Sequence, residues 1–502
     1  MTRITARRRT TFAVAASAAA AVALLGAAPT VATADITEMS TPVPIAAPDG
    51  MTMSYILNTK VANPGQTRLV EKAVTEAGGV VVQSWPQIGV VVAHSQRSAF
   101  RADVRAAGGN ALDSVGASRT AEVLEGTPAA AQAPWGPGAN GYKKGASKPT
   151  NGDVEAPTTP AETLDTREGE QWDMQMIKAD QAHKITDGSR NVLVGVLDSG
   201  IDPDHPDLQP NIDLATSVNC TDGGRPDTSA TGWNPTTSDH GTHVAGTIAA
   251  PRNGVGIVGV APNVRMAAVK VVSDEGYIYP EYAVCGFVWA GLKGMDVTNN
   301  SYYIDPFEFW CSDQPDQAAA KEAVTRAVAW STKQGVVHAA AAGNSAKDLS
   351  DKTKFQDTGS PNDSTPVVRT INNECHDIPA ELPGVVTTSS ATRTGVLSNF
   401  SNRGLGVIDV SAPGSSILST IVTNNGYGTK SGTSMASPHA AGVLALMKSV
   451  HPELTPEQMV AKLRADATDK ACSTATGPAC VGTPEDNSYF GEGMIDALKA
   501  VS

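Results

Sequence analysis

The sequence predicts an α/β protein built on a doubly wound, mostly parallel sheet that is flanked by helices and preceded by a small α+β domain. Two observations support this prediction. In residues 171–502, short apolar runs typical of buried strands alternate with Ala-rich stretches of helical length. In residues 51–123, shorter segments follow the order βαββαβ, which is typical of a ferredoxin-like plait.

Residues 1–34 have the pattern of a secretory signal peptide. Arginines near the start precede an Ala- and Leu-rich core from Phe12 to Leu25, and no acidic residue occurs before Asp35. The sequence Ala32-Thr33-Ala34 predicts cleavage after Ala34, which would leave 35–50 as an N-terminal pro-segment. A membrane anchor is the alternative, and the adjacent arginines leave open the choice between general and twin-arginine export.

The composition agrees with export. The net charge is −13 and charged residues make up 18% of the chain. These values suit a soluble extracellular protein better than one that coats nucleic acid or anionic lipid. Because no second long apolar segment follows the signal, we expect the cleaved protein to be free in solution and monomeric.

The small domain and the segment after it differ in composition. A plait alone implies no function, so an independent binding domain is one interpretation of it. Residues 124–170 are dense in Pro, Gly, Ala, Thr and Ser, cannot bury a core, and are expected to form a flexible linker. The expected plait elements are strands over 54–58, 79–85, 88–93 and 112–118 and helices over 66–77 and 95–107.

The large domain is expected to alternate strands with helices. The last helix is entered by the capping sequence Thr455-Pro456-Glu457. The expected strands cover 191–198, 264–272, 296–300 and 336–342, and the expected helices begin at His240 or cover 280–292, 317–334, 440–450 and 455–467.

Ser434 is a candidate nucleophile. It follows a polar, Gly-containing turn and precedes small apolar residues, so it should lie at a helix start, where free N–H groups can stabilise an oxyanion. A serine in that position is most often only a cap, and a hydroxyl nucleophile also needs a base and a group that orients the base. Asp198, at the end of a buried strand, and His240, at a helix start, could face the same sheet edge and supply both.

Three motifs resemble those of the subtilisin-like serine peptidases, in that family's chain order. The resemblance spans roughly 171–502 and implies that Asp198, His240 and Ser434 form a catalytic triad. It also implies that the amide of Asn344, which follows Gly343 at the end of a strand, donates to the oxyanion with the N–H of Ser434. The motifs are Asp198-Ser199-Gly200, His240-Gly241-Thr242-His243 and Gly432-Thr433-Ser434-Met435-Ala436.

The resemblance also gives the plait and the substrate groove a role. It implies that the plait is an inhibitory propeptide of the I9 type, which blocks the cleft until it is cut off within about 125–170. Ser301 and Gly343 are expected to contact substrate through their backbones. Tyr302 and Tyr303 replace a Leu and a Gly of the family pattern beside the specificity pocket. Their bulk either narrows the groove or lies outside it and packs.

Calcium and disulfides are the remaining expectations. No catalytic cofactor is implied, but relatives bind structural calcium through an Asp, an Asn and backbone carbonyls, which suit this ion. The N-terminal ligand stays open among Glu168, Glu170 and Gln171. The corresponding residues are Asp207 and Asn253 with the backbone of Pro251, Val255 and Ile257.

Six cysteines in an exported chain indicate up to three disulfides. We expect Cys472 to pair with Cys480 across a short, turn-rich loop and Cys285 to pair with Cys311, which leaves Cys220 and Cys375. A zinc site is the alternative, although no Cys-x-x-Cys motif supports it. We expect His205, His243 and His439 to be structural.

These observations predict a secreted serine endopeptidase that is made as a zymogen, acts on proteins and binds its own propeptide. A narrow processing peptidase or an exopeptidase is the alternative if the tyrosines block the groove. A catalytically silent secreted binding protein is the alternative from another class, although all triad residues are present.

Overall fold

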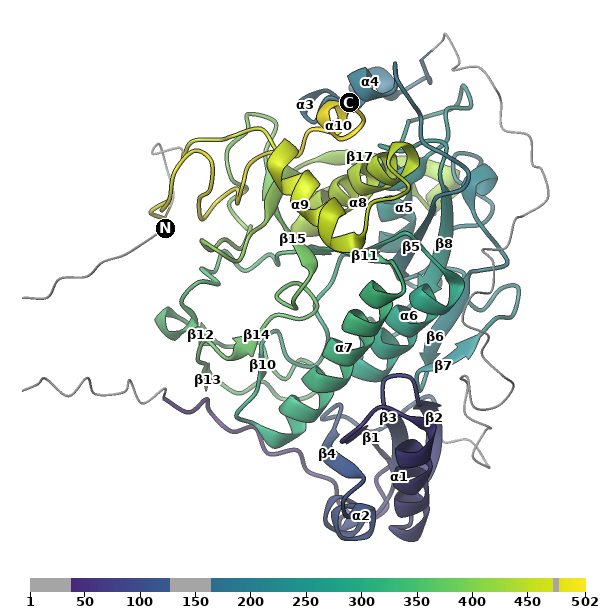
Figure 1. Ribbon diagram of the computed structural model, residues 1–502, viewed down its shortest axis with the longest axis vertical. Coiled ribbons are helices and arrows are strands. Elements are labelled where there is room, and N and C mark those ends of the chain that lie inside the picture. Colours follow the sequence, from purple (N-terminus) through teal and green to yellow (C-terminus); the bar gives the residue numbers. More distant parts are fainter. Residues whose placement is uncertain (1–37, 127–163, 473–477) are drawn as a thin grey trace, which may run out of the picture. The chain divides into compact units, whose positions relative to one another are not determined.

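The computed structural model describes residues 38–126, 164–472 and 478–502 (Figure 1). The expected signal peptide, its cleavage site after Ala34 and most of the expected linker lie outside the described residues. The chain divides into two compact units, residues 1–38 and 39–502, and the description below concerns the second. Within the described ranges, no helix is long and apolar enough to cross a membrane.

Residues 53–117 form the predicted ferredoxin-like plait. The four-stranded sheet is antiparallel and has the order β2-β3-β1-β4. The first helix begins where the Asn63 side chain accepts the N–H of Gln66, with a proline at its first position. The second helix begins at Phe100 rather than at Ser95, because Ser95 still pairs with Met53 in the sheet. The elements are β1 (Met53–Thr59), α1 (Pro64–Glu76), β2 (Val80–Trp85), β3 (Val90–Ser95), α2 (Phe100–Gly108) and β4 (Leu112–Ala117).

The large domain is built on an eight-stranded sheet with the order β16-β15-β11-β9-β5-β8-β6-β7. All neighbours in it are parallel except β6 and β7, which confirms the predicted doubly wound fold. Its strands are β5 (Leu193–Asp198), β6 (Val218–Asp222), β7 (Arg225–Asp227), β8 (Arg265–Lys270), β9 (Val297–Asn300), β11 (Val337–Ala341), β15 (Val385–Ala391) and β16 (Val410–Pro413).

Helices cover both faces of this sheet (Figure 1). On β5, Val194 and Val196 join the core that contains α5 (His240–Ala249) and α8 (Thr433–Val450). Leu193 and Leu197 instead join the core that contains α6 (Pro280–Lys293) and α7 (Pro315–Lys333). This alternation is the period-2 pattern of a strand that is buried on both faces. The apolar helix expected over 440–450 begins earlier, at Thr433.

Shorter elements complete the chain. The capping pattern at Thr455 is confirmed, and its hydroxyl and the Gln458 side chain form a capping box. The short helices are η1 (Glu168–Glu170), α3 (Trp172–Met176), α4 (Ala179–Ala182), η2 (Gln209–Asn211), η3 (Lys352–Lys354), η4 (Thr423–Asn425), α9 (Pro456–Asp466) and α10 (Ala497–Ala500). The two-stranded sheets pair β10 (Trp310–Cys311) with β14 (Cys375–His376), β12 (Gln356–Asp357) with β13 (Arg369–Thr370), and β17 (Ile417–Ile421) with β18 (Gly426–Lys430).

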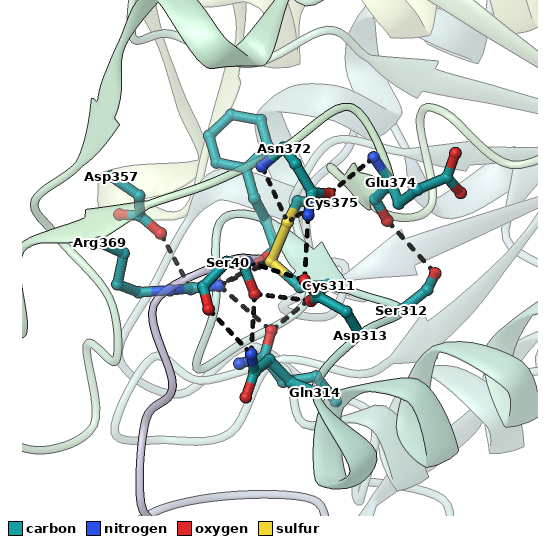
Figure 2. The surroundings of a disulfide bond; sticks show 12 residues. Ser40, Cys311, Ser312, Asp313, Gln314, Asp357, Arg369, Asn372, Glu374 and Cys375 are labelled. Atoms are coloured by element: carbon teal, nitrogen blue, oxygen red, sulfur yellow. Dashed lines mark hydrogen bonds and ion pairs between the residues drawn. A yellow bond between two sulfur atoms is a disulfide. The ribbon is translucent and has the colours of Figure 1, made fainter. Parts of the chain in front are cut away.

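All six cysteines form disulfides, which removes the thiolates that a zinc site would need. The predicted bridge Cys472–Cys480 is confirmed. The predicted pairing of Cys285 with Cys311 is wrong: Cys285 bonds to Cys220, and Cys311 bonds to Cys375 (Figure 2). Helix α6 packs on β6, which brings Cys285 to Cys220, and the register of β10 against β14 sets Cys311 opposite Cys375.

The plait contacts α7 and the start of α6. The Asn58 side chain donates to the carbonyl of Ala319 at 2.8 Å, and the N–H of Ala117 donates to Asp316 at 3.0 Å. Just after β4, the Arg119 guanidinium pairs with Glu281 on α6, and both side chains are fully buried. Removing only one partner of such a pair strongly destabilises the folded protein, because the other charge is left buried without a partner.

Candidate active site

Asp198 and His240 meet at the carboxyl edge of the sheet. Asp198 is the last residue of β5 and is buried, and His240 is the first residue of α5. The Nδ1 atom of His240 lies 2.9 and 3.0 Å from the two carboxylate oxygens of Asp198. The Asp198 carboxylate also accepts the N–H of Ser199 at 2.8 Å, which restricts its rotation. The imidazole is therefore held with its other nitrogen directed away from the carboxylate.

Ser434 is the second residue of α8, as a helix-start position predicts. Its hydroxyl donates to the carbonyl of Ser301 at 3.1 Å, and the Ser301 hydroxyl donates back to the carbonyl of Ser434 at 2.8 Å. No hydrogen bond joins Ser434 to His240 in the described part of the chain. Catalytic hydrogen bonds of this kind often form only when substrate is bound.

The Asn344 side chain is oriented by Thr433, which sequence reasoning did not single out. Its Oδ1 atom accepts the N–H of Thr433 at 2.8 Å and the Thr433 hydroxyl at 2.9 Å. The same hydroxyl accepts the N–H of Gly343 at 3.1 Å. Because Oδ1 is engaged, the Nδ2 donor is the group left to face a ligand. The signal available in the sequence was only a Thr directly before the candidate nucleophile.

A cavity of about 300 Å³ opens beside Ser434 and brings together the predicted substrate-binding residues. Both tyrosines lie at the cavity rather than outside it, and each uses its hydroxyl. Tyr302 donates to the Asn300 side chain at 3.1 Å, and Tyr303 accepts from Asn362 at 3.2 Å. The lining includes Ser301, Tyr302, Tyr303, Gly343, Asn344 and Ser434.

His240 has a raised pKa. Burial is the largest single influence and lowers the pKa, but the charge of Asp198 and its hydrogen bond together outweigh burial. Two smaller influences oppose each other: the Lys430 ammonium lowers the pKa of His240, and the Asp239 carboxylate, which pairs with Lys430 at 2.8 Å, raises it. The net pKa is above the ordinary value of 6.5, so neutral His240 predominates only on the alkaline side of that value.

We expect kcat/KM to fall on acidification with a midpoint above pH 6.5, because a general base must be unprotonated. Replacing Lys430 with Met should move this limb to higher pH, since it removes a charge that lowers the pKa of His240. Initial rates against pH on one peptide substrate measure both effects. Lys354→Met, at an exposed lysine of η3, is the control. If the midpoint pH of the Lys430→Met enzyme is equal to or lower than that of the control, the prediction is wrong.

The three other histidines of interest make structural contacts. His243 is buried, its Nε2 atom contacts the carbonyls of Ile417 and Gly428, and burial lowers its pKa to about 4. His205 contacts the carbonyl of Gly426 at 3.0 Å. His439 contacts the carboxylate of Asp173 at 3.0 Å.

The predicted calcium ligands fit such an ion only in part. Asp207 is fully buried, and its Oδ1 atom is without a hydrogen-bond partner among the described residues, which suits a cation ligand. Burial raises the pKa of Asp207 to about 7. The Asn253 oxygen does not fit as placed, because it accepts the N–H of Val255 at 2.9 Å. Asp165, which the sequence did not indicate, accepts the N–H of Gly254 in the same loop at 2.6 Å.

The candidate N-terminal ligands are engaged elsewhere. Glu168 pairs with Arg252 at 2.6 Å, and Glu170 pairs with Arg167 at 2.7 Å. The Gln171 side chain exchanges two hydrogen bonds with the backbone of Val258. Of the expected side chains, Asp207 is the one with a buried oxygen atom that has no hydrogen-bond partner within the described residues.

A doubly wound sheet with an Asp–His pair and a helix-start Ser at its carboxyl edge is the arrangement of a serine hydrolase. A family model described as "Subtilase family" matches residues 189–493. Subtilisin DY from Bacillus licheniformis is 33% identical over 329 residues, which cover 66% of this chain and 97% of that protein. Subtilisin E from Bacillus subtilis (strain 168) is 34% identical over 329 residues, which cover 66% and 70%.

Solved structures agree in fold. The epidermin leader peptide processing serine protease from Staphylococcus aureus has a TM-score of 0.63 at 22% identity and covers 90% of this chain and 98% of its own. Fervidolysin from Fervidobacterium pennivorans has a TM-score of 0.61 at 23% identity and covers 90% and 61%. The protein belongs to the subtilase family and is a serine endopeptidase.

Proposed function

We propose that the protein is an exported endopeptidase in which Ser434 attacks the peptide carbonyl, His240 takes its proton and Asp198 orients His240. The observation that carries the proposal is the contact of His240 Nδ1 with both Asp198 oxygens, at the edge of the sheet where Ser434 begins a helix. In the first step, the Ser434 hydroxyl leaves the carbonyl of Ser301 and gives its proton to Nε2 of His240. The same imidazole then donates that proton to the leaving amine.

The negative charge of the tetrahedral intermediate develops on the former carbonyl oxygen. The Nδ2 group of Asn344 and the N–H of Ser434 are its donors in this proposal. Thr433 acts as a positioning residue, because its two hydrogen bonds to Asn344 leave Nδ2 free to donate. Losing one such donor costs about 2.7–4 kcal/mol of transition-state stabilisation in a related enzyme.

A fluorophosphonate that reacts with activated serines tests the assignment. Protein from the culture medium should carry the label on Ser434, located by peptide mass spectrometry, and its N-terminal sequence should begin within about 125–170. Label on another serine would contradict the assignment. A labelled chain that begins upstream of Asp35 would contradict export by signal cleavage.

In this proposal, the plait is an intramolecular inhibitor. The buried Arg119–Glu281 pair and the hydrogen bonds to α7 support its association with the large domain. Two further contacts lie just beyond Arg119, where the N–H groups of Thr120 and Ala121 donate to Asp363 at 2.9 and 3.1 Å. The plait should therefore stay bound after chain cleavage until it is degraded.

We also propose a structural calcium ion at Asp207, with the backbone carbonyls of the Asn253 loop as further ligands. Calcium at about 100 times its Kd would add about 2.7 kcal/mol to the unfolding free energy. We expect a chelator to lower the Tm of the purified enzyme and added calcium to restore it, as measured by scanning calorimetry. Asp207→Asn should abolish the difference and Asp180→Asn, at an exposed acid of α4, should preserve it. Equal Tm values with and without chelator would contradict the site.

A further inference from the structure

The cavity beside Ser434 is lined by carboxyl groups on the side away from the nucleophile. Three carboxylates line it together with Ser434, Gly343 and Tyr303. These are Asp305, Glu308 and Asp377, and the cavity they line is called the acidic pocket below. None of the three carboxylates was singled out in the sequence, because they lie outside the motifs and are brought to Ser434 only by the fold.

Two of the three carboxylates are satisfied by neighbouring groups. Glu308 pairs with the Lys347 ammonium at 2.9 Å and accepts the Ser345 hydroxyl at 2.7 Å. Asp305 accepts the Asn362 amide at 2.6 Å and the N–H of Ile278 at 2.5 Å. Burial raises the pKa of Asp305 to about 7. Neither carboxylate therefore needs a ligand to complete its hydrogen bonds.

Asp377 differs, because it is buried with no partner. The residue is 1% exposed, and neither carboxylate oxygen has a hydrogen-bond partner within the described structure. Burial raises its pKa, and the charges of Glu381 and Glu308 add to that effect. A buried carboxyl group without partners is costly, and native structures tolerate such groups mainly where a ligand or ion completes them.

The position of Asp377 places it close to the reacting centre. A Cβ built on Gly343 would lie 3.2 Å from its Oδ2 atom. Because Gly343 directly precedes Asn344, the proposed oxyanion donor, the carboxylate stands against the backbone that forms one side of the cavity. Gly343 has a φ of +95°, and a Cβ there would also lie 2.4 Å from the Asn402 amide nitrogen, so this position requires glycine.

The segment that carries Asp377 is held firmly. Its N–H donates to Glu381 at 2.6 Å, and Glu381 pairs with Lys352 at 2.6 Å. Two residues before Asp377, the disulfide Cys311–Cys375 ties the segment to β10, and Figure 2 shows the hydrogen bonds that surround this bridge. The backbone that carries the carboxylate is therefore held in place from several sides.

We propose that the acidic pocket binds the side chain of a lysine or arginine immediately before the scissile bond, with Asp377 as the specificity-determining residue. The proposal rests on the proposed role of Ser434, whose position at one end of the cavity defines which substrate residue enters it. A cation provides the missing partner for Asp377, while the aliphatic stem of the side chain lies along Tyr303, Ile278 and Ala341, which also line the cavity.

Apolar and acidic substrate side chains should bind less well in the acidic pocket. An uncharged apolar residue would leave the buried Asp377 carboxyl group unpaired, and a site built to pair a polar group rejects an analogue that lacks it. An acidic residue would bring a second carboxyl group to Asp377 without a cation to pair either of them. The pocket therefore predicts selectivity between a lysine and a norleucine, which have nearly the same shape.

The test measures kcat/KM of the processed enzyme on peptide anilides that differ only before the scissile bond: lysine, arginine, norleucine, phenylalanine and glutamate. We expect lysine or arginine to exceed norleucine by about 100-fold or more, the effect of one desolvated charge pair. Equal or greater rates for norleucine or phenylalanine would overturn the proposal. Fluorophosphonate labelling of the same sample separates this outcome from a failure of the catalytic assignment, because an enzyme labelled on Ser434 with apolar preference contradicts the pocket alone.

A variant assigns the effect to one residue. Asp377→Asn should lower kcat/KM for lysine and arginine by about 100-fold and leave that for norleucine unchanged or higher. Glu374→Gln makes the same charge change at an exposed acid three residues earlier and should alter neither. Equal losses on all substrates would overturn the specificity role. If Asp377→Asn does not fold, the comparison of substrates with the unaltered enzyme still decides the proposal.

Discussion

Replacing Ser434 with Ala should lower kcat by about 10⁶-fold, a loss of the size known for a subtilisin. The residue lies in the first turn of α8 beside the cavity, and in our proposal its hydroxyl is the group that attacks the substrate. Steady-state hydrolysis of a peptide anilide measures the loss. Ser431→Ala is a matched control, since Ser431 is exposed and lies three residues earlier.

Two further measurements make this prediction specific. The double variant Ser434→Ala, His240→Ala should be no slower than Ser434→Ala, because residues that act as a unit are not additive. Ser434→Ala should also be recovered with the plait still attached if maturation is by self-cleavage. A residual rate within about tenfold of the unaltered enzyme would mean that another group is the nucleophile.

Asp198→Asn should lower kcat by about 10⁴-fold near pH 7, because it reverses the tautomer of His240. The N–H of Ser199 donates to Oδ1 of Asp198, so the carbonyl oxygen of an asparagine would take that position. Its NH₂ group would then face Nδ1 of His240, which would have to accept, and the ring proton would move to Nε2. An imidazole protonated on Nε2 cannot receive the proton of Ser434.

The pH dependence separates this explanation from simple misfolding. The charge of Asp198 raises the pKa of His240, so its removal should move the remaining acid limb to lower pH. Asp239→Asn is the control for kcat: Asp239 contacts Lys430 rather than the imidazole, so kcat at alkaline pH should change little. Its acid limb should also move to lower pH, because Asp239 raises the pKa of His240 as well. If the Asp198→Asn enzyme has a nearly normal kcat, the proposed role of Asp198 in orienting His240 is wrong.

The structure shows where the two tyrosines that depart from the family pattern lie. The sequence left open whether Tyr302 and Tyr303 narrow the groove or lie outside it. Both line the cavity, and their hydroxyl groups contact the side chains of Asn300 and Asn362. The cavity remains open beside them, so the feature that restricts substrates in our proposal is charge rather than bulk.

The sequence by itself determined the fold class, the plait and the positions of the triad candidates. These features depend on local patterns: buried strands read as apolar runs, helix starts carry small and polar residues, and short motifs stay intact within one strand or one helix. Asp198 and His240 could be paired in advance because each ends or begins an element at the same sheet edge. The disulfide Cys472–Cys480 was predictable because its loop is short.

The tertiary structure alone decided which distant residues meet. Cys285 pairs with Cys220 and Cys311 with Cys375 because helix packing and strand register, not separation along the chain, bring the sulfur atoms together. Thr433 supports Asn344, 89 residues away, and Asp377 reaches the cavity beside Ser434 from the segment after β14. An unpaired buried carboxylate cannot be recognised from sequence, because its burial and its lack of partners depend on every element that surrounds it.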